Sequence, residues 1–398
     1  MNPLIEQADR VLAATYKRQP LFLKSGQGCK LRDDQGREFL DFLAGIAVCS
    51  LGHAHPRIAE AVFAQAKTLV HVSNLYYTQP QVELAARLVE KSFADRVFFC
   101  NSGAEANEAA LKLARRFFKE KGQPHRYRVV VMKQSFHGRT MATLSATGQK
   151  KIQKGFEPLL EGFDFVPFND FDALSGAVGP ETCAVMLEPI QGEGGVRCAD
   201  PDYLQAVRRL CDEKGLLLIF DEIQTGMGRT GKLFAYEQFG IAPDIMTLAK
   251  ALANGLPIGA MLAKEATAEA FGPGVHASTF GGTPLVCAAA LEVLNIFEEE
   301  KILQKCTAVG AYFKDALKGL KERHFSVVDV RGMGLLLGME LDKEGDPLVA
   351  ACRERGFLIN CVQGNVLRFA PPLIIDTGAV DALIRCMDDV LDESEKAQ

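Results

Sequence analysis

Short apolar runs alternate with longer amphipathic stretches along the middle of the chain, from about residue 57 onward. The runs are rich in leucine and β-branched residues, and polar and apolar side chains do not alternate within them. Strands that are buried on both faces of a mostly parallel, helix-covered sheet have this composition. The pattern therefore predicts an α/β domain. Its expected strands lie at residues 96–100, 128–133, 163–168, 183–189, 215–222, 244–250 and 259–263.

Both ends of the chain have a different pattern. Residues 21–48 look like short antiparallel strands around an Asp-Asp-Gln-Gly turn. A long helical stretch at 284–320 leads into a final segment that mixes helices with strands, among them the run Gly-Leu-Leu-Leu-Gly-Met-Glu-Leu. We expect residues 56–290 to form a large domain. Residues 1–55 should join residues 291–398 in a smaller α+β domain.

The overall composition is that of an ordinary globular protein, with 398 residues of which 48% are hydrophobic and 24% charged. The net charge of −5 gives no basic surplus that would favour nucleic acid or an anionic membrane as a partner. No apolar stretch is long enough to span a bilayer, and residues 1–20 do not resemble a targeting signal. The eleven cysteines are scattered, without a Cys-x-x-Cys pair, so we expect reduced thiols and a cytoplasmic location.

Several of the predicted strands end on polar residues, namely Asn101, Glu188, Asp221 and Lys250. In open α/β sheets the ligand binds beyond the carboxyl ends of the strands. Asp221 and Lys250 on neighbouring strands are consistent with a buried ion pair, which by itself indicates nothing more. They are also consistent with an aldehyde cofactor, because a desolvated lysine can form a Schiff base and a carboxylate can keep a pyridine nitrogen protonated. Alone, the pair favours the ion pair.

A third element changes this balance. Residues 98–117 form an expected strand, then Asn-Ser-Gly-Ala, then an amphipathic helix that opens with Glu105 and Glu108. The small residues allow backbone N–H groups to approach an anion at the helix N-terminus, although a plain N-cap has the same composition. A phosphate cup, an amine and a carboxylate on one sheet edge together indicate pyridoxal 5'-phosphate.

Residues 218–260, LIFDEIQTGMGRTGKLFAYEQFGIAPDIMTLAKALANGLPIGA, resemble the class III, or subgroup II, pyridoxal-phosphate-dependent aminotransferases. NSGAEANEAALKLAR at 101–115 and STFGGTPLVCAAAL at 278–291 match the same family, and the resemblance covers essentially the whole chain. It implies a fold type I enzyme with a mostly parallel seven-stranded sheet in the large domain and a small domain from both termini. It also implies a homodimer with shared active sites.

The resemblance assigns cofactor roles to individual residues. Lys250 would hold the cofactor as a Schiff base and later carry the proton between the substrate carbon and the cofactor carbon, and Asp221 would bind the ring nitrogen. Gln224 would lie near the ring hydroxyl. Ile223 would cover one ring face and Phe136 the other, although Phe136 is equally consistent with core packing.

The phosphate of the cofactor would bind at the start of the helix. The resemblance places Ser102, Gly103 and Ala104 in the phosphate cup, and Thr279 of the partner subunit completes it. Without the family, Thr279 would be an ordinary loop residue. The pair of histidines in Gly-His-Ala-His-Pro at 52–56 lacks a third ligand and is more typical of a structural turn, so we expect no metal.

Two arginines are candidates for binding substrate carboxylates, although a structural ion pair is the ordinary reading of either. The resemblance makes Arg368 the group that binds the α-carboxylate of glutamate or 2-oxoglutarate. Arg139 would bind the distal carboxylate, or the α-carboxylate of an ω-amino substrate. Glu193, otherwise a solvated turn residue, would pair with Arg368 and mask it while an ω-amine occupies the site. The role of Glu188 stays open.

Within this family, SNLYYTQP at 73–80 and SFHGRT at 135–140 look most like the acetylornithine aminotransferase branch. Arg139 and Ser278 of the partner subunit would then contact N2-acetylornithine. The expected reaction moves its terminal amino group to 2-oxoglutarate, giving N-acetylglutamate 5-semialdehyde and glutamate, and runs in reverse during arginine synthesis. Related activities toward succinylornithine, succinyldiaminopimelate, ornithine or 4-aminobutyrate remain alternatives.

Gly-Met-Gly-Arg-Thr-Gly at 226–231 is a formal dinucleotide-binding motif, with Asp244 at a suitable distance for a ribose contact. An NAD-dependent dehydrogenase is therefore a different alternative. Its context is unfavourable, because five residues separate the motif from the strand end and Asp244 precedes the next strand instead of closing it. A binding or regulatory protein that kept the fold and lost turnover is also disfavoured, because Lys250, Asp221, Glu193 and Arg368 are retained together. A non-transaminating relative, such as an aminomutase, would not need the Glu193–Arg368 pair.

Overall fold

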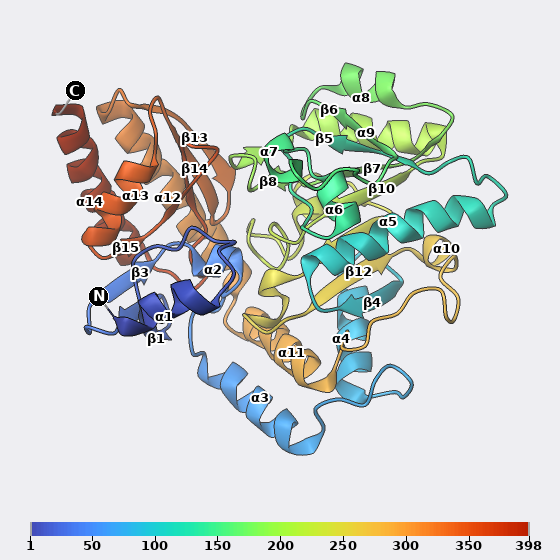
Figure 1. Cartoon of the computed structure of the whole chain (residues 1–398), viewed down its shortest axis with the longest axis horizontal. Helices are drawn as coiled ribbons and strands as arrows, with labels where there is room; N and C mark the ends of the chain where they lie inside the picture. The colour runs from blue at the N-terminus through green and yellow to red at the C-terminus, as the bar shows by residue number, and fades with distance from the viewer. Residues whose placement is uncertain (1, 397–398) are drawn as a thin grey trace.

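A seven-stranded sheet forms the centre of one half of the molecule in the computed structural model, which describes residues 2–396 (Figure 1). The strand order is β4-β12-β11-β10-β7-β5-β6, and only β12 runs antiparallel to its two neighbours. The predicted α/β class and mostly parallel seven-stranded sheet are confirmed. The strands are β4 (Arg96–Cys100), β5 (Arg128–Met132), β6 (Phe163–Val166), β7 (Thr182–Leu187), β10 (Leu217–Asp221), β11 (Ile245–Leu248) and β12 (Gly259–Ala263).

Helices cover both faces of this sheet, which explains its unbroken apolar strands. Along β5, Val129 and Val131 belong to the core that includes α5 (Gly103–Glu120). Val130 and Met132 belong to the opposite core, which includes α8 (Phe171–Ala177) and α9 (Pro201–Lys214). Residues that alternate along the central strands therefore meet one helical layer or the other.

The second half of the molecule contains two smaller sheets. In one, β13, β14, β17 and β16 lie side by side and are antiparallel; α12 (Ile302–Arg323) packs against β13 and β14, and α14 (Thr377–Lys396) packs against α12. In the other, β15 pairs in parallel with β3, so segments from both ends of the chain share one sheet. The strands are β1 (Leu23–Gln27), β2 (Lys30–Asp33), β3 (Glu38–Asp41), β13 (Val327–Met333), β14 (Leu336–Leu341), β15 (Phe357–Leu358), β16 (Asn360–Val362) and β17 (Val366–Phe369).

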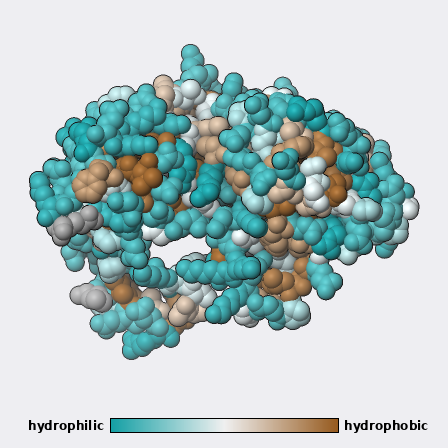
Figure 2. Space-filling model, turned by 90° about the horizontal axis from the view of Figure 1, so that it is seen from above, coloured by the Kyte–Doolittle hydropathy of each residue, from teal (hydrophilic) through white to brown (hydrophobic). Residues whose placement is uncertain are grey.

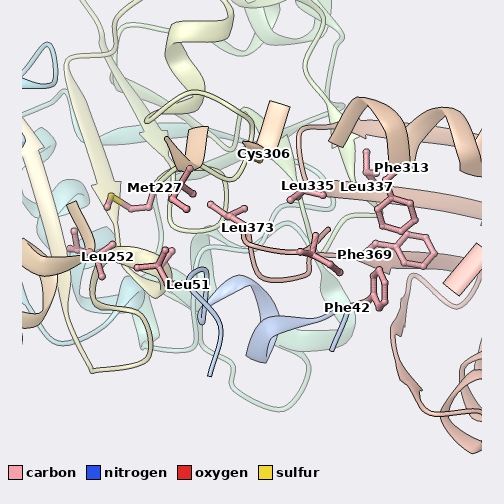
Figure 3. Packing of buried hydrophobic residues seen from close by; sticks show 14 of the residues in the cluster. Phe42, Leu51, Met227, Leu252, Cys306, Phe313, Leu335, Leu337, Phe369 and Leu373 are labelled. Carbon is pink, nitrogen blue, oxygen red and sulfur yellow. The ribbon is translucent and has the colours of Figure 1, made fainter. Parts of the chain in front are cut away.

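One apolar core connects the two halves. It runs from α11 (Pro284–Glu299), against which α3 (Pro56–Thr68) and α4 (Gln79–Glu90) pack, to the helices of the C-terminal part. Figure 3 shows Phe42, Phe313 and Phe369 gathered at one end of this cluster. The ring centroid of Phe313 lies 5.7 Å from that of Phe42 and 5.2 Å from that of Phe369, both in edge-on contacts. These contacts join N-terminal and C-terminal segments of the chain.

The remaining elements are short or peripheral. None of the helices within residues 2–396 combines the length and the apolar character that crossing a membrane requires. The surface in Figure 2 is largely hydrophilic, with hydrophobic side chains gathered in patches. The remaining elements are α1 (Pro3–Val11), α2 (Ala44–Ala47), α6 (Met141–Ala146), α7 (Lys150–Gln153), β8 (Ile190–Gln191), β9 (Arg197–Cys198), η1 (Ala235–Gln238), η2 (Lys250–Ala253), α10 (Glu265–Ala268) and α13 (Asp346–Glu354).

Candidate active site

A cavity of about 390 Å³ opens at the carboxyl ends of the parallel strands of the large sheet. All four polar residues predicted at strand ends line it. The cavity therefore lies at the sheet edge where the sequence predicts a ligand site. Most of the other candidate residues line it as well. The residues assigned from sequence that line the cavity are Ser102, Gly103, Ala104, Phe136, Arg139, Glu193, Asp221, Ile223, Gln224 and Lys250.

Three candidate residues do not line this cavity within one chain. Arg368 lies behind the wall and reaches it through Glu193. Ser278 and Thr279 line a separate hollow of about 380 Å³, together with Asn101 and Phe280. Asn101 is the link between the two spaces, because it lines both and its Nδ2 donates to Ser278 Oγ at 3.2 Å.

Lys250 lies two residues beyond the last residue of β11, so the strand is shorter than the predicted run to residue 250. Its backbone takes φ of 44°, a left-handed conformation that is unusual for a side-chain-bearing residue and is often found at functional sites. Within residues 2–396, Nζ has neither a hydrogen bond nor an ion pair. Burial lowers the pKa of this lysine to about 8, and the charge of Arg368 acts in the same direction. About one amine in ten is then uncharged at pH 7.

Asp221 is the last residue of β10 and is held by three donors instead of by Lys250. Its Oδ2 accepts hydrogen bonds from His137 Nδ1 and Asn107 Nδ2, both at 2.8 Å, and its Oδ1 accepts from the backbone N–H of Ile223 at 3.1 Å. No ion pair joins Asp221 to Lys250 in the described part of the chain. The alternative prediction, a simple buried ion pair between these two residues, is therefore wrong.

Sequence reasoning missed the residues that fix this carboxylate. Asn107, fully buried on α5, also donates to the carbonyl of His137 at 2.7 Å and accepts from Thr247 Oγ1 at 2.7 Å. His137 is buried, and its Nε2 has no partner among the described residues. The available signal was a polar Asn on the apolar face of the helix that follows Gly103, but only the fold shows what that side chain contacts.

The start of α5 has the geometry of an anion site. Ser102 caps the helix, and its Oγ accepts from the N–H of Glu105 at 3.2 Å. Gly103 must lack a side chain, because a Cβ there would lie 2.7 Å from Cδ1 of Ile223. The first N–H groups of an eighteen-residue helix thus lie at the cavity wall, where the helix dipole favours negative charge.

Glu188 follows β7 and is a buried carboxyl group of the cavity wall. Its Oε2 accepts from the backbone N–H of Phe136 at 3.0 Å, which fixes the loop that carries Phe136 and Arg139. Burial raises the pKa of Glu188 well above its ordinary value, and the negative charge of Asp221 adds to this. The exposed guanidinium of Arg139 lies 5.8 Å from the centre of the Phe136 ring, at the cavity wall.

Glu193 and Arg368 form an ion pair across the two halves of the molecule. Arg368 lies on β17 and is only 1% exposed, and its Nη1 donates to Glu193 Oε1. Gln224 bridges them, donating to Glu193 and accepting from Arg368, both at 3.4 Å. Burial alone would raise the pKa of Glu193, but the charges of Arg368 and Lys250 outweigh it and lower the pKa, so both partners are charged.

The loop of the formal dinucleotide motif has another use. Gly228 packs against Phe297 and Gly231 against Thr307, in each case closer than a Cβ would allow, and no helix opens directly after the loop. Asp244 is occupied by Arg208 and Lys264, at 2.9 and 2.8 Å. The dehydrogenase hypothesis is therefore wrong, because the glycines serve packing and the acidic residue is not free for a ribose.

The turn with two histidines is also structural. His53 Nε2 lies 2.7 Å from Oδ2 of Asp41, and the bond to this carboxylate raises the pKa of His53 to about 9. Oδ1 of the same carboxylate accepts from the N–H groups of Leu43 and Ala44, both at 2.8 Å. No cluster of three or more metal-ligating side chains lies within residues 2–396.

The donor set of the cavity fits pyridoxal phosphate. It offers the amine of Lys250, which has no partner within residues 2–396, for an aldehyde, a carboxylate oriented by Asn107 and His137 for a ring nitrogen, and a glycine-containing helix start for a phosphate. The chain matches the family model for class-III aminotransferases over residues 11–391 and belongs to this family. Because the family uses pyridoxal phosphate, the protein is a pyridoxal-phosphate-dependent transaminase.

Three of the individual relatives resemble this chain over nearly its whole length. The acetylornithine aminotransferase of Caldanaerobacter subterraneus subsp. tengcongensis is 52% identical over 391 residues, which cover 98% of this chain and 99% of the relative. The crystal structure of N-acetylornithine aminotransferase from Stenotrophomonas maltophilia K279a matches with a TM-score of 0.85 at 38% identity, over 99% and 100% of the two chains. The ornithine aminotransferase of Toxoplasma gondii, with partial occupancy of PLP at its active site, has a TM-score of 0.95 at 34% identity, over 99% and 95%.

Proposed function

We propose that this protein transfers the terminal amino group of N2-acetylornithine to 2-oxoglutarate, giving N-acetylglutamate 5-semialdehyde and glutamate. In arginine biosynthesis the reaction runs in the opposite direction. The relatives with about half of their residues identical support this choice of substrate. The structural observation that carries it is the Glu193–Arg368 ion pair beside an unpartnered lysine amine.

The cofactor residues each have one task in this proposal. Pyridoxal phosphate, when bound, supplies an aldehyde that takes up amines and a ring that withdraws electrons from the neighbouring carbon. Lys250 Nζ would hold the cofactor. Once the substrate amine has released it, the same Nζ would take up and return the proton of the substrate carbon. Its lowered pKa suits this work near neutral pH. Asp221 holds the ring nitrogen, and His137 and Asn107 fix the orientation of its carboxylate.

The remaining cofactor contacts follow from position around the same cavity. Ile223 and Phe136 would cover the two faces of the ring, and Gln224 would bind near the ring hydroxyl; all three line the cavity. Ser102, Gly103 and Ala104 provide the phosphate cup at the start of α5. These three segments follow three different strands, β4, β5 and β10, and all of them line the same cavity.

The ion pair explains how one cavity serves two different substrates. While Glu193 covers Arg368, the neutral arm of an ω-amino acid can approach Lys250 without meeting an open positive charge. Opening of the pair frees the guanidinium for the α-carboxylate of glutamate or 2-oxoglutarate, which it can bind through two hydrogen bonds. Arg139, exposed at the cavity wall, would bind the distal carboxylate of glutamate or the α-carboxylate of the ω-amino donor.

We further propose a homodimer with shared active sites. Thr279 and the 59%-exposed Phe280 do not line the main cavity of their own chain but a second hollow, where another subunit can receive them. Asn74 ties this loop to residues 73–80 by donating to the carbonyls of Ser278 and Gly281, both at 3.0 Å. The same region exposes many large apolar side chains, as expected of a contact surface. They include Leu69, Val70, Leu75, Tyr76 and Tyr77.

The proposal also includes the division into domains and the cellular compartment. The pairing of β15 with β3 supports a small domain made of residues 1–55 and 291–398 beside a large domain of residues 56–290. The eleven cysteines are free thiols in the structure, and a reducing compartment such as the cytoplasm keeps them so.

Transfer from ornithine is the second candidate, because an ornithine aminotransferase shares nearly the whole backbone. The deciding experiment compares acetylornithine, succinylornithine, succinyldiaminopimelate, ornithine and 4-aminobutyrate as donors to 2-oxoglutarate with one enzyme preparation. We expect the highest kcat/KM with acetylornithine. A strong preference for unacylated ornithine would overturn the proposed substrate and leave the transaminase assignment intact.

A further inference from the structure

Arg229 is the central residue of the glycine-rich loop at 226–231, and no step described above uses it. Its guanidinium is among the largest fully buried side chains, with 1% exposure. No carboxylate forms an ion pair with it in the described part of the chain. Burial lowers the pKa of Arg229 to about 10, so the group still carries its charge at neutral pH. An unpaired buried charge is costly and calls for an explanation.

The contacts of Arg229 join three segments that lie far apart in the sequence. Nη1 donates to the carbonyl of Leu335 at 3.1 Å and to that of Pro371 at 2.5 Å, and Nη2 donates to Ser50 Oγ at 3.2 Å. The backbone N–H of Leu335 returns a bond to the carbonyl of Arg229 at 3.0 Å. Gly334 permits this approach, since a Cβ there would lie 2.6 Å from that carbonyl oxygen.

These carbonyls mark the ends of the two strands that hold the substrate arginine. In the pairing of β14 with β17, Gly338 lies opposite Arg368 and Leu337 opposite Phe369. The same register continued by two residues sets Leu335 opposite Pro371, which are the two carbonyls that Nη1 bridges. Arg229 therefore links the two strands at the end of the pair that is nearest to the loop. One of its acceptors, Pro371, lies three residues after Arg368 in the chain.

The loop that carries Arg229 begins at the cofactor residues. Ile223 and Gln224 come six and five residues before it, and Gln224 already contacts both members of the Glu193–Arg368 pair. Around Arg229 the packing is apolar, and Figure 3 shows Leu373 between Met227 of the same loop and Leu335. A buried guanidinium held by three acceptors restricts movement between the loop and the strand pair, although its Nε has no partner among the described residues.

We propose that Arg229 is a positioning residue for dicarboxylate recognition, holding the strand of Arg368 in register with the loop of Ile223 and Gln224. The inference rests on the proposed role of Arg368 in binding glutamate and 2-oxoglutarate. A lysine cannot replace this function fully, because one ammonium group cannot span the three acceptors as the planar fork does. The acyl-amino donor does not bind Arg368 itself, and in the closed pair Glu193 holds Arg368 directly, so donor binding depends less on this register.

The test compares Arg229→Met and Arg229→Lys with the wild-type holoenzyme. We expect KM for 2-oxoglutarate and for glutamate to rise about tenfold or more, with Arg229→Lys intermediate, while KM for acetylornithine changes less than about threefold. The Kd of glutarate, a dicarboxylate that cannot react, should rise in parallel when measured by calorimetry. Should Arg229→Met fail to fold, Arg229→Lys alone must show the same split.

A matched control is available in the same chain. Arg126 also donates to backbone carbonyls, those of Thr182, Lys214 and Gly215. It lies at the amino ends of the strands of the large sheet, whereas the cavity lies at their carboxyl ends. Arg126→Met should alter stability without separating the two substrates. Equal losses for both substrates in the Arg229 variants, or unchanged glutarate binding, would overturn the inference. A wild-type enzyme that rejects acetylornithine refutes the proposed donor instead, and glutarate binding still decides the role of Arg229.

Discussion

Glu193→Gln separates the two half-reactions of the proposed mechanism. The change removes one negative charge and keeps the shape, so Arg368 stays in place without its ionic partner. Arg368 is almost fully buried, and a hydrogen bond between charged groups in such a place contributes about 2 kcal/mol, which corresponds to about 30-fold in an equilibrium constant. The loss falls on the state in which the pair is closed, which is the state that receives the acyl-amino donor.

Glutamate should behave differently in the same variant. It needs Arg368 open, and the variant no longer has an ion pair to break before the carboxylate binds. We therefore expect kcat/KM for acetylornithine to fall by about 30-fold, while kcat/KM for glutamate stays equal or rises. Removal of the Glu193 charge also removes an influence that raises the pKa of Lys250, so that pKa should fall below about 8.

The assay follows the absorbance of the bound cofactor after one substrate is added alone, so that each half-reaction is measured separately. Glu265→Gln serves as control, because Glu265 forms an exposed ion pair with Arg96 at the other end of β4. It should leave both half-reactions unchanged. Equal losses with acetylornithine and glutamate in Glu193→Gln would refute the reasoning, since the ion pair would then serve stability and not the choice between substrates.

Three further predictions concern the same cavity. Arg139→Ala should raise KM for acetylornithine far more than KM for glutamate in steady-state kinetics, and equal rises would count against its role in donor binding. Mixed dimers of Lys250→Ala with Thr279→Ala subunits should recover activity that neither pure variant has, because one of the two shared sites is then intact; no recovery would contradict sharing. Lys250→Met should raise the unfolding temperature of the cofactor-free protein at pH 7, where unfolding frees a lysine of pKa near 10.5 from a site that lowers it to about 8. Unfolded chains bind more protons than folded ones between these two values, so the gain should shrink as pH rises toward about 10 in thermal melts, and a constant gain would be inconsistent with the shift.

The strand ends were predictable because they depend on local pattern. An unalternating apolar run predicts a doubly covered strand, and the first polar residue after it predicts a position at the sheet edge. Glu188, Asp221 and Lys250 follow this logic, and the structure places all three at one cavity. The exact end of β11 was not predictable, because the left-handed turn at Lys250 depends on what surrounds it.

The partners of these residues depend on contacts that no local pattern encodes. Asn107 and His137 lie on different elements and meet only because α5 crosses the sheet above Asp221. Arg229 looked like part of a dinucleotide motif, since the spacing of its glycines is the same whether they receive a phosphate or a neighbouring helix. Only the packing of that loop against Phe297 and Thr307 tells these two uses apart.

The central claim is that the amine of residue 250 carries the cofactor. Reduction of the yellow holoenzyme with borohydride, followed by proteolysis and mass spectrometry, tests it most directly. The account predicts a pyridoxyl group on the peptide that contains Lys250, and none on that peptide from the Lys250→Ala variant. A holoenzyme saturated with pyridoxal phosphate that yields no adduct at Lys250, or yields it at another lysine, would contradict the account.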